Sequence, residues 1–171
     1  MIPTKPLSSA MLSIDCAAET DHICTTIRQN LKEPLKRQGI VLGLSGGVDS
    51  SVTAALCVRA LGKERVFGLL MPERDSDSDT LRLSQSIVDH LQIPSATENI
   101  SSILEAFSCY RRRNEAIRTV IADFQAEWKC KIVLPSIIHG QQLRFFSIVV
   151  QKPDGQIIRR RLAPQAYLGI V

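Results

Sequence analysis

The sequence of 171 residues has few aromatic side chains and no long apolar run. Aromatic residues make up 5% of it, and they do not alternate with basic residues. Nucleic-acid binding is therefore not expected, although the formal net charge is +4. No apolar run approaches the roughly 20 residues that cross a membrane, and the first residues lack the charged-then-apolar order of a secretory signal. We expect no membrane segment.

Cysteine and histidine do not occur at the spacings that hold metals. The five cysteines include no C-x-x-C pair, and their odd number argues against a disulfide framework: Cys16, Cys24, Cys57, Cys109 and Cys130. They indicate reduced thiols in a cytoplasmic protein. The three histidines lie far apart, at positions 22, 90 and 139, and no metal site is predicted from them.

The composition, 44% apolar and 22% charged, is that of a globular domain. Asp15 is placed to cap a leading helix over residues 15–39, in which Pro34 introduces a bend or a break. Apolar runs at residues 40–44 and 66–71 read as buried strands, and a weaker strand is expected within 95–100. Helical patterns separate them. This β-α-β-α-β order predicts an α/β fold with a doubly wound parallel sheet, its core spanning residues 40–127.

The pattern changes after Trp128. Apolar and polar residues alternate around Phe146, Ile148 and Val150, and the segment 152–155 reads Lys-Pro-Asp-Gly, which is typical of a turn. We expect residues 128–163 to form an antiparallel hairpin inserted into the α/β domain and separate from its parallel sheet.

Two common phosphate-binding motifs are absent. A Walker A loop requires G-x-x-x-x-G-K-[ST], but no lysine lies between Gly39 and Gly62. The dinucleotide fingerprint G-x-G-x-x-G does not fit glycines at positions 43, 46 and 47. In their place, residues 43–51 read Gly-Leu-Ser-Gly-Gly-Val-Asp-Ser-Ser, directly after the first apolar run.

This glycine loop has the chemistry of a phosphate site. Paired glycines let the backbone approach an anion, and a helix N-terminus with the hydroxyls of Ser45, Ser50 and Ser51 favours phosphate. The carboxylate of Asp49 repels phosphate unless a divalent cation lies between them. The loop therefore predicts a polyphosphate site with Mg²⁺. The alternative is an ordinary glycine turn that precedes a helix.

The pattern S-G-G-x-D-S matches the PP-loop of the ATP pyrophosphatase superfamily. Residues 39–51 and 60–72 together resemble ammonia-dependent NAD synthetase, and the Met71-Pro72 ending is the more discriminating part. Residues 110–117 and 128–162 resemble a bacterial subgroup of NAD-synthetase-like proteins. The resemblance runs from about residue 15 to the last residue.

The resemblance implies a reaction, and it assigns residues to it. The nicotinate carboxylate of deamido-NAD attacks the α-phosphorus of ATP, pyrophosphate leaves, and ammonia then converts the acyl-adenylate to NAD and AMP. Mg²⁺ is expected at Asp49, and the full-length family implies a homodimer. The residues expected to bind ATP are Gly43, Leu44, Ser45, Gly46, Gly47, Val48, Asp49 and Ser50, with Met71 and Arg74.

The resemblance also implies that the enzyme continues well beyond the last residue here, with further strands, a threonine loop and an acidic partner for Mg²⁺. We therefore expect a truncated N-terminal half. Three functions stay open: an NAD-synthetase-like ligase, an inactive nucleotide-binding module, and another PP-loop enzyme such as a tRNA thiolase. The last would need catalytic cysteines, for which the sequence shows no context.

Two further features allow two interpretations each. The arginine triplets at 111–113 and 159–161 form solvated faces or attract an anionic substrate. The polar loop at 72–79 receives a nucleoside or only solvates a crossover, since ligands bind at the carboxyl ends of parallel strands.

Overall fold

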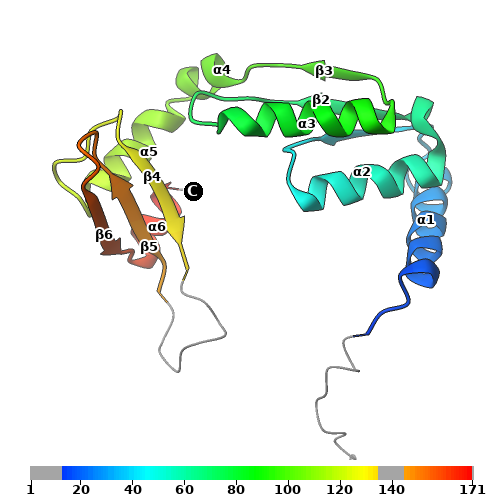
Figure 1. The fold of residues 1–171 in the computed structure, drawn as a ribbon, viewed down its shortest axis with the longest axis horizontal. Coiled ribbons are helices and arrows are strands. Elements are labelled where there is room, and N and C mark those ends of the chain that lie inside the picture. The colour runs from blue at the N-terminus through cyan, green and yellow to red at the C-terminus, as the bar shows by residue number, and fades with distance from the viewer. Residues whose placement is uncertain (1–12, 135–144, 171) are drawn as a thin grey trace, which may run out of the picture. The chain divides into compact units, whose positions relative to one another are not determined.

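The computed structural model describes residues 13–134 and 145–170, apart from the side chain of Ser78. The chain divides into two compact units, Met1–Ser101 and Ser102–Val171. Figure 1 labels the elements of both. The first unit contains α1 (Cys16–Lys32), β1 (Ile40–Gly43), α2 (Val48–Leu61), the 3₁₀ helix η2 (Lys63–Arg65), β2 (Val66–Leu70), α3 (Ser78–Leu91) and β3 (Ser95–Thr97). Helix α4 (Ser101–Ala106) begins at the boundary.

The first unit is built on a parallel sheet in the order β1-β2-β3. The second and third strands thus lie to one side of the first. Helices α2 and α3 pack against the same face of β2, where Val66 and Leu70 are 1% exposed. Ala54 of α2 and Val88 of α3 belong to the same buried cluster. Among the described residues β1 is an edge strand, and its Val41 is 67% exposed.

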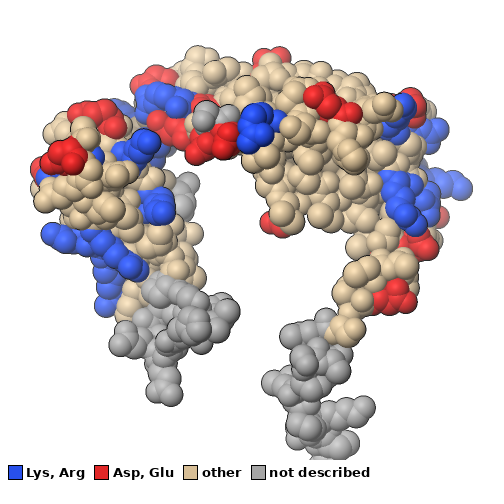
Figure 2. Space-filling view, in the orientation of Figure 1, with Lys and Arg blue, Asp and Glu red and all other residues tan. Residues whose placement is uncertain are grey.

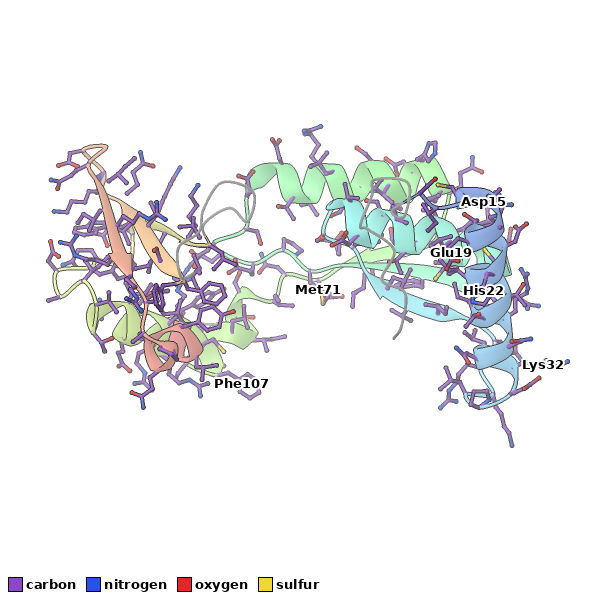
Figure 3. The ribbon with its side chains drawn as sticks, turned by 90° about the horizontal axis from the view of Figure 1, so that it is seen from below. Asp15, Glu19, His22, Lys32, Met71 and Phe107 are labelled. Carbon is purple, nitrogen blue, oxygen red and sulfur yellow. The ribbon has the colours of Figure 1, made fainter. Side chains whose placement is uncertain are left out.

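Helix α1 begins where the sequence predicts. The carboxylate of Asp15 accepts hydrogen bonds from the backbone N–H groups of Ala17 and Ala18, at 3.0 and 3.1 Å. The helix ends at Lys32, shortly before Pro34, which cannot continue it. Figure 3 marks both ends of this helix and places Met71 away from it. Cys24 joins α1 to α2 through its thiol, 3.6 Å from the Leu56 carbonyl oxygen.

The second unit is built on an antiparallel sheet. Its elements are α5 (Cys109–Arg118), β4 (Lys129–Val133), β5 (Ser147–Gln151), β6 (Ile157–Arg161) and α6 (Pro164–Ile170). The sheet order is β4-β5-β6. Residues 152–155 form the predicted turn, with Gly155 at φ +86°. Ile148 and Val150 of β5 are fully buried against Ile117 and Phe124.

The predicted fold class is confirmed. A parallel α/β sheet is followed by a separate antiparallel sheet, as the change of pattern after Trp128 indicated. The division into a core of residues 40–127 and an insertion of residues 128–163 stays a prediction. In the structure α5 contributes Ile117 to the core of the second unit. Within the described ranges, no helix has the length and apolar character needed to span a membrane.

Candidate functional site

The glycine loop lies between β1 and α2, at the carboxyl end of the first strand. The Leu44 amide still donates to the Leu69 carbonyl at 3.0 Å, so the chain leaves the sheet only after this residue. Gly46 follows at φ +72°, a conformation that side-chain-bearing residues rarely adopt. Gly47 then precedes α2 without a side-chain cap. The first backbone N–H groups of α2 are therefore available to an anion.

Two of the three predicted loop hydroxyls face each other. The Oγ atoms of Ser45 and Ser50 are 3.2 Å apart, and the Ser45 amide donates to Ser50 Oγ at 3.3 Å. Ser50 Oγ in turn donates to the Gly47 carbonyl at 3.1 Å. The Ser51 hydroxyl donates to that same carbonyl at 2.8 Å. Ser45 and Ser50 thus meet across the loop, and both Ser50 and Ser51 bond to the carbonyl of Gly47, the residue before α2.

Asp49 lies in the first turn of α2 and is exposed. No group of three or more His, Cys, Asp or Glu side chains able to hold a metal occurs in the described part of the chain. A single carboxylate nevertheless suits Mg²⁺ accompanying a polyphosphate, because Mg²⁺ takes one or two protein carboxylates and completes its shell with phosphate oxygens and water. The residues present fit that arrangement.

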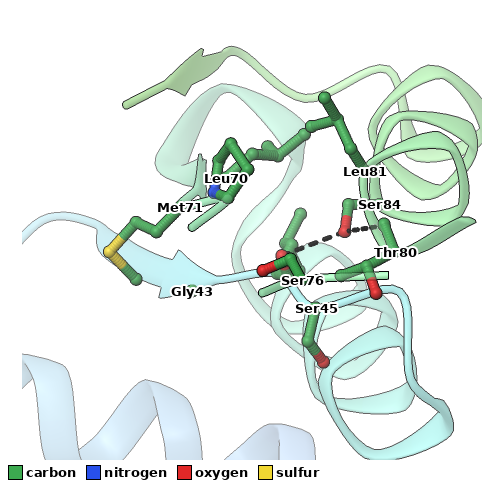
Figure 4. Close-up of a pocket in the computed structure, with 10 residues that line it drawn as sticks. Gly43, Ser45, Leu70, Met71, Ser76, Thr80, Leu81 and Ser84 are labelled. Carbon is green, nitrogen blue, oxygen red and sulfur yellow. Dashed lines mark hydrogen bonds between the residues drawn. The ribbon is translucent and has the colours of Figure 1, made fainter. Parts of the chain in front are cut away.

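A cavity of about 320 Å³ opens beside the loop (Figure 4). Its lining comes from the end of β1, the end of β2 and the first turns of α3: Gly43, Leu44, Ser45, Leu70, Met71, Pro72, Ser76, Thr80, Leu81 and Ser84. This volume lies at the lower end of the range for small-molecule sites. The cavity is placed where parallel α/β sheets bind ligands, outside the carboxyl ends of their strands.

Helix α3 forms one wall of the cavity, and the sequence did not assign its residues to the site. Ser84 is 1% exposed, and its hydroxyl donates to the Leu44 carbonyl at 3.0 Å. Asp77 caps the helix by accepting from the Asp79 amide at 2.8 Å. The position of Ser84 on the apolar face of α3, between Leu81 and Val88, is the sequence signal that could have pointed to it.

Of the two residues after β2 that were predicted to bind the nucleotide, the structure places one at the cavity. Met71 lines the cavity, and its terminal methyl carbon lies 3.3 Å from where a Cβ on Gly43 would be. Arg74 is not among the residues that line the cavity, and its Nε pairs with the Asp75 carboxylate at 3.3 Å. The surrounding loop is acidic, as Figure 2 shows near the start of α3. Such a loop favours a neutral group or a cation-bridged anion over a bare phosphate.

The cysteines take no part in this cavity. Cys24 and Cys57 are buried between α1 and α2, Cys16 is exposed, and none of the described cysteines lines the cavity. Burial raises the pKa of the Cys57 thiol, and the nearby Cys24 adds to the shift. A raised pKa makes a thiol a poor nucleophile. The arrangement gives no support to a thiolase chemistry.

The first arginine triplet makes contacts within the second unit. Arg111 pairs with Glu115 at 3.0 Å. The guanidinium of Arg113 lies 5.6 Å from the ring centre of Tyr110. These contacts favour the interpretation of the triplet as a solvated face of α5. The exposed Arg111–Glu115 pair contributes little to stability.

In the second triplet, Arg161 packs over the ring of Phe145 and Arg160 donates to the neighbouring Arg159 carbonyl at 3.1 Å. Phe145 and Arg161 line a separate cavity of the second unit together with Phe146, Leu162, Ala163, Pro164, Tyr167 and Leu168. Of this triplet, Arg161 thus packs against an aromatic ring at the end of β6.

A parallel sheet, a strand-to-helix Ser-Gly-Gly loop and a cavity at the strand ends define an α/β protein of the PP-loop type. The family model for NAD synthase matches residues 19–137. The chain belongs to the NAD synthase family.

Relatives named NH(3)-dependent NAD(+) synthetase agree with this assignment. The chain is 47% identical to one from Mesorhizobium japonicum over 94% of its own length and 50% of the relative's. It is 44% identical to one from Rhizobium rhizogenes, over 96% of its own length and 50% of the relative's. The chain therefore spans about half the length of these relatives.

Solved structures give the same fold. An NH3-dependent NAD synthetase from Campylobacter jejuni, in complex with the nitrate ion, matches with a TM-score of 0.52 at 41% identity over 56% of this chain and 41% of that one. An NMN synthetase from Francisella tularensis matches with a TM-score of 0.52 at 20% identity, over 61% of this chain and 48% of that one. The second likeness shows the fold alone.

Proposed function

We propose that this chain carries the ATP-binding part of an ammonia-dependent NAD synthase. The observation that carries the proposal is the loop from Ser45 to Ser50. It combines a positive-φ glycine, two facing hydroxyls and an uncapped helix N-terminus, and its Ser45 lines the cavity. These groups are donors suited to a polyphosphate.

Each predicted residue has a place in this proposal. The backbone from Gly43 to Val48 and the side chains of Ser45 and Ser50 hold the phosphates. Met71 offers backbone groups to the adenine from the end of β2, at the cavity wall. Arg74 is a nucleotide contact only if it leaves Asp75, with which it pairs.

Asp49 would hold Mg²⁺ together with the phosphate oxygens of ATP. The ion supplies charge neutralisation to the pyrophosphate that leaves. The chain's own N–H groups and hydroxyls bind the same oxygens and orient the α-phosphorus toward the attacking carboxylate. Donors fixed before the reaction stabilise developing charge without reorganisation.

The reaction that fits is the synthesis of NAD with ammonia, for which the relatives are named. The carboxylate of deamido-NAD forms a bond to the α-phosphorus of ATP as the bond to pyrophosphate breaks. Ammonia then forms the amide bond, AMP leaves with the bonding electron pair, and the nitrogen loses a proton. A cytoplasmic location and a homodimer, both expected for the family, belong to this proposal.

A second candidate is a nucleotide-binding module without catalysis. The observation that favours it is that the described residues placed at the site are proposed to bind ATP or Mg²⁺, and none of them is assigned a catalytic role. It would keep the loop and the cavity, bind ATP and form no NAD.

Isothermal titration of the chain with ATP tests the proposal and separates the two candidates. We expect one binding site whose affinity falls when Mg²⁺ is removed with EDTA. A parallel assay with ATP, Mg²⁺, deamido-NAD and ammonia then measures NAD. Binding with NAD formation supports the ligase, and binding without it supports the module. No binding of ATP at millimolar concentration contradicts both.

A further inference from the structure

Ser84 connects α3 to the glycine loop across 40 residues of sequence. It is the most buried polar residue described in the chain, at 1% exposure. Its hydroxyl lies 2.7 Å from the Thr80 carbonyl of its own helix and 3.0 Å from the Leu44 carbonyl (Figure 4). A hydroxyl carries one hydrogen, which these two acceptors share. The second contact distinguishes Ser84 from a serine that bonds only within its helix.

The Leu44 carbonyl and the Ser45 amide belong to one planar, trans peptide unit. Fixing the carbonyl on one side therefore fixes the direction of the N–H on the other. In the structure that N–H points into the loop and donates to Ser50 Oγ at 3.3 Å. The Ser84 hydroxyl thus determines where the first amide of the phosphate loop points.

The next residue of the loop is also held by α3. A Cβ on Gly46 would lie 3.0 Å from the Ser84 amide nitrogen and 3.0 Å from the Thr80 carbonyl oxygen. The loop backbone at Gly46 therefore lies directly on the helix. The hydrogen bond of Ser84 and this close packing act on adjacent peptide units.

We propose that Ser84 is a positioning residue for phosphate binding. Through the Leu44 carbonyl it orients the Ser45 amide toward the phosphates of a nucleotide, without touching the nucleotide itself. The proposal rests on the proposed ATP site. It predicts that removing the hydroxyl lowers the affinity for phosphate groups and leaves the affinity for adenosine unchanged.

The test compares Ser84→Ala with Ser86→Ala. Ser86 lies on the same helix, is exposed, and donates only to the Arg82 carbonyl, at 2.9 Å. The control therefore loses the same type of bond within the helix and no bond to the loop. Adenosine, inorganic pyrophosphate and ATP, each with Mg²⁺, are titrated into both variants and the unsubstituted chain, with affinities read from NMR shifts.

We expect Ser84→Ala to weaken pyrophosphate and ATP about tenfold, the effect of one lost hydrogen bond of ordinary strength. Its affinity for adenosine stays unchanged, and Ser86→Ala matches the unsubstituted chain for all three ligands. Equal affinities in the two variants overturn the proposal. An equal loss for adenosine and pyrophosphate also overturns it, because that result indicates general damage to the fold.

Amide hydrogen exchange without nucleotide keeps the inference separate from the ATP proposal. We expect the amides of Ser45 and Gly46 to exchange faster in Ser84→Ala than in Ser86→Ala. If the unsubstituted chain binds no ATP, the nucleotide proposal fails. The amide hydrogen exchange rates then test by themselves whether Ser84 orients the loop. Faster exchange supports that role, and equal rates overturn it.

Discussion

A Cβ atom on Gly46 would lie 2.6 Å from the Cβ atom of Leu83, closer than side-chain atoms approach each other in proteins. The glycine loop and α3 are therefore in direct contact, with no space for a side chain between them. Gly46 also has φ +72°, which favours glycine independently of that contact. Both constraints bear on the residue at the centre of the proposed phosphate site.

We expect Gly46→Ala to destabilise the fold by about 2–4 kcal/mol, adding steric overlap to left-handed backbone strain. Gly155→Ala is the matched control, because Gly155 has φ +86° and nothing lies within 4 Å of its added Cβ. We expect that change to cost only the strain, about 1–2 kcal/mol. Urea unfolding of both variants measures the difference. Equal losses of stability would show that α3 does not constrain the loop.

The effect of Asp49→Asn on the affinity for ATP should depend on Mg²⁺. With Mg²⁺ present, Asp49→Asn should weaken ATP about tenfold, because one ligand charge is lost. In EDTA the same change should leave the affinity equal or higher, because a carboxylate near phosphate is repulsive. Calorimetry in both buffers measures this. If the variant shows the same Mg²⁺ dependence as the unsubstituted chain, Asp49 does not hold the ion.

Thiol reactivity should follow burial and pKa. At pH 8, iodoacetamide should modify Cys16, which is exposed, well before Cys57, whose pKa is raised by burial and by Cys24. The thiolate is the reacting form, so a raised pKa lowers its population at this pH. Peptide mapping by mass spectrometry follows each site, and unfolding in urea should equalise the two rates. Rapid modification of Cys57 in the folded chain would contradict its placement between α1 and α2.

A polypeptide of residues 1–171 expressed alone should bind ATP yet form NAD far more slowly than the full-length relative from Mesorhizobium japonicum. It covers half of that relative, and loss of one transition-state donor alone costs about 10²–10³ in rate. The edge of β1, with Val41 at 67% exposure, should also promote self-association. Assays of NAD formation and light scattering on both proteins test this. A monomer that forms NAD as fast as this relative would contradict the expectation.

The sequence was sufficient for the parts of the fold that depend on local pattern. Residues 40–44 and 66–71 were predicted as strands, and β1 and β2 occupy them to within one residue. Asp15 caps α1 as its side chain and position indicated. The alternation around Ile148 correctly predicted an antiparallel strand, in which Ile148 and Val150 share one fully buried face. The opposite face is also covered in part, because Ser147 is buried as well.

The wall of the site could not be predicted in the same way. Ser84 lies on the apolar face of its helix, but its partner Leu44 lies 40 residues earlier. A bond of that range depends on how α3 packs against the loop, which no local pattern specifies. Likewise, the hydroxyls of Ser45, Ser50 and Ser51 are equivalent in sequence. Only the backbone geometry brings Ser45 and Ser50 together and directs both Ser50 and Ser51 to the Gly47 carbonyl.

The central claim is that the loop from Ser45 to Ser50 binds the phosphates of ATP, and amide NMR of the isotope-labelled chain tests it most directly. On titration with Mg²⁺ and ATP, we expect the largest shifts at the amides of Ser45 to Ser50, with smaller ones at Met71. Pyrophosphate should reproduce the loop shifts without those at Met71. Shifts elsewhere in the chain with none in this loop, or no shifts at millimolar ATP, would contradict the account.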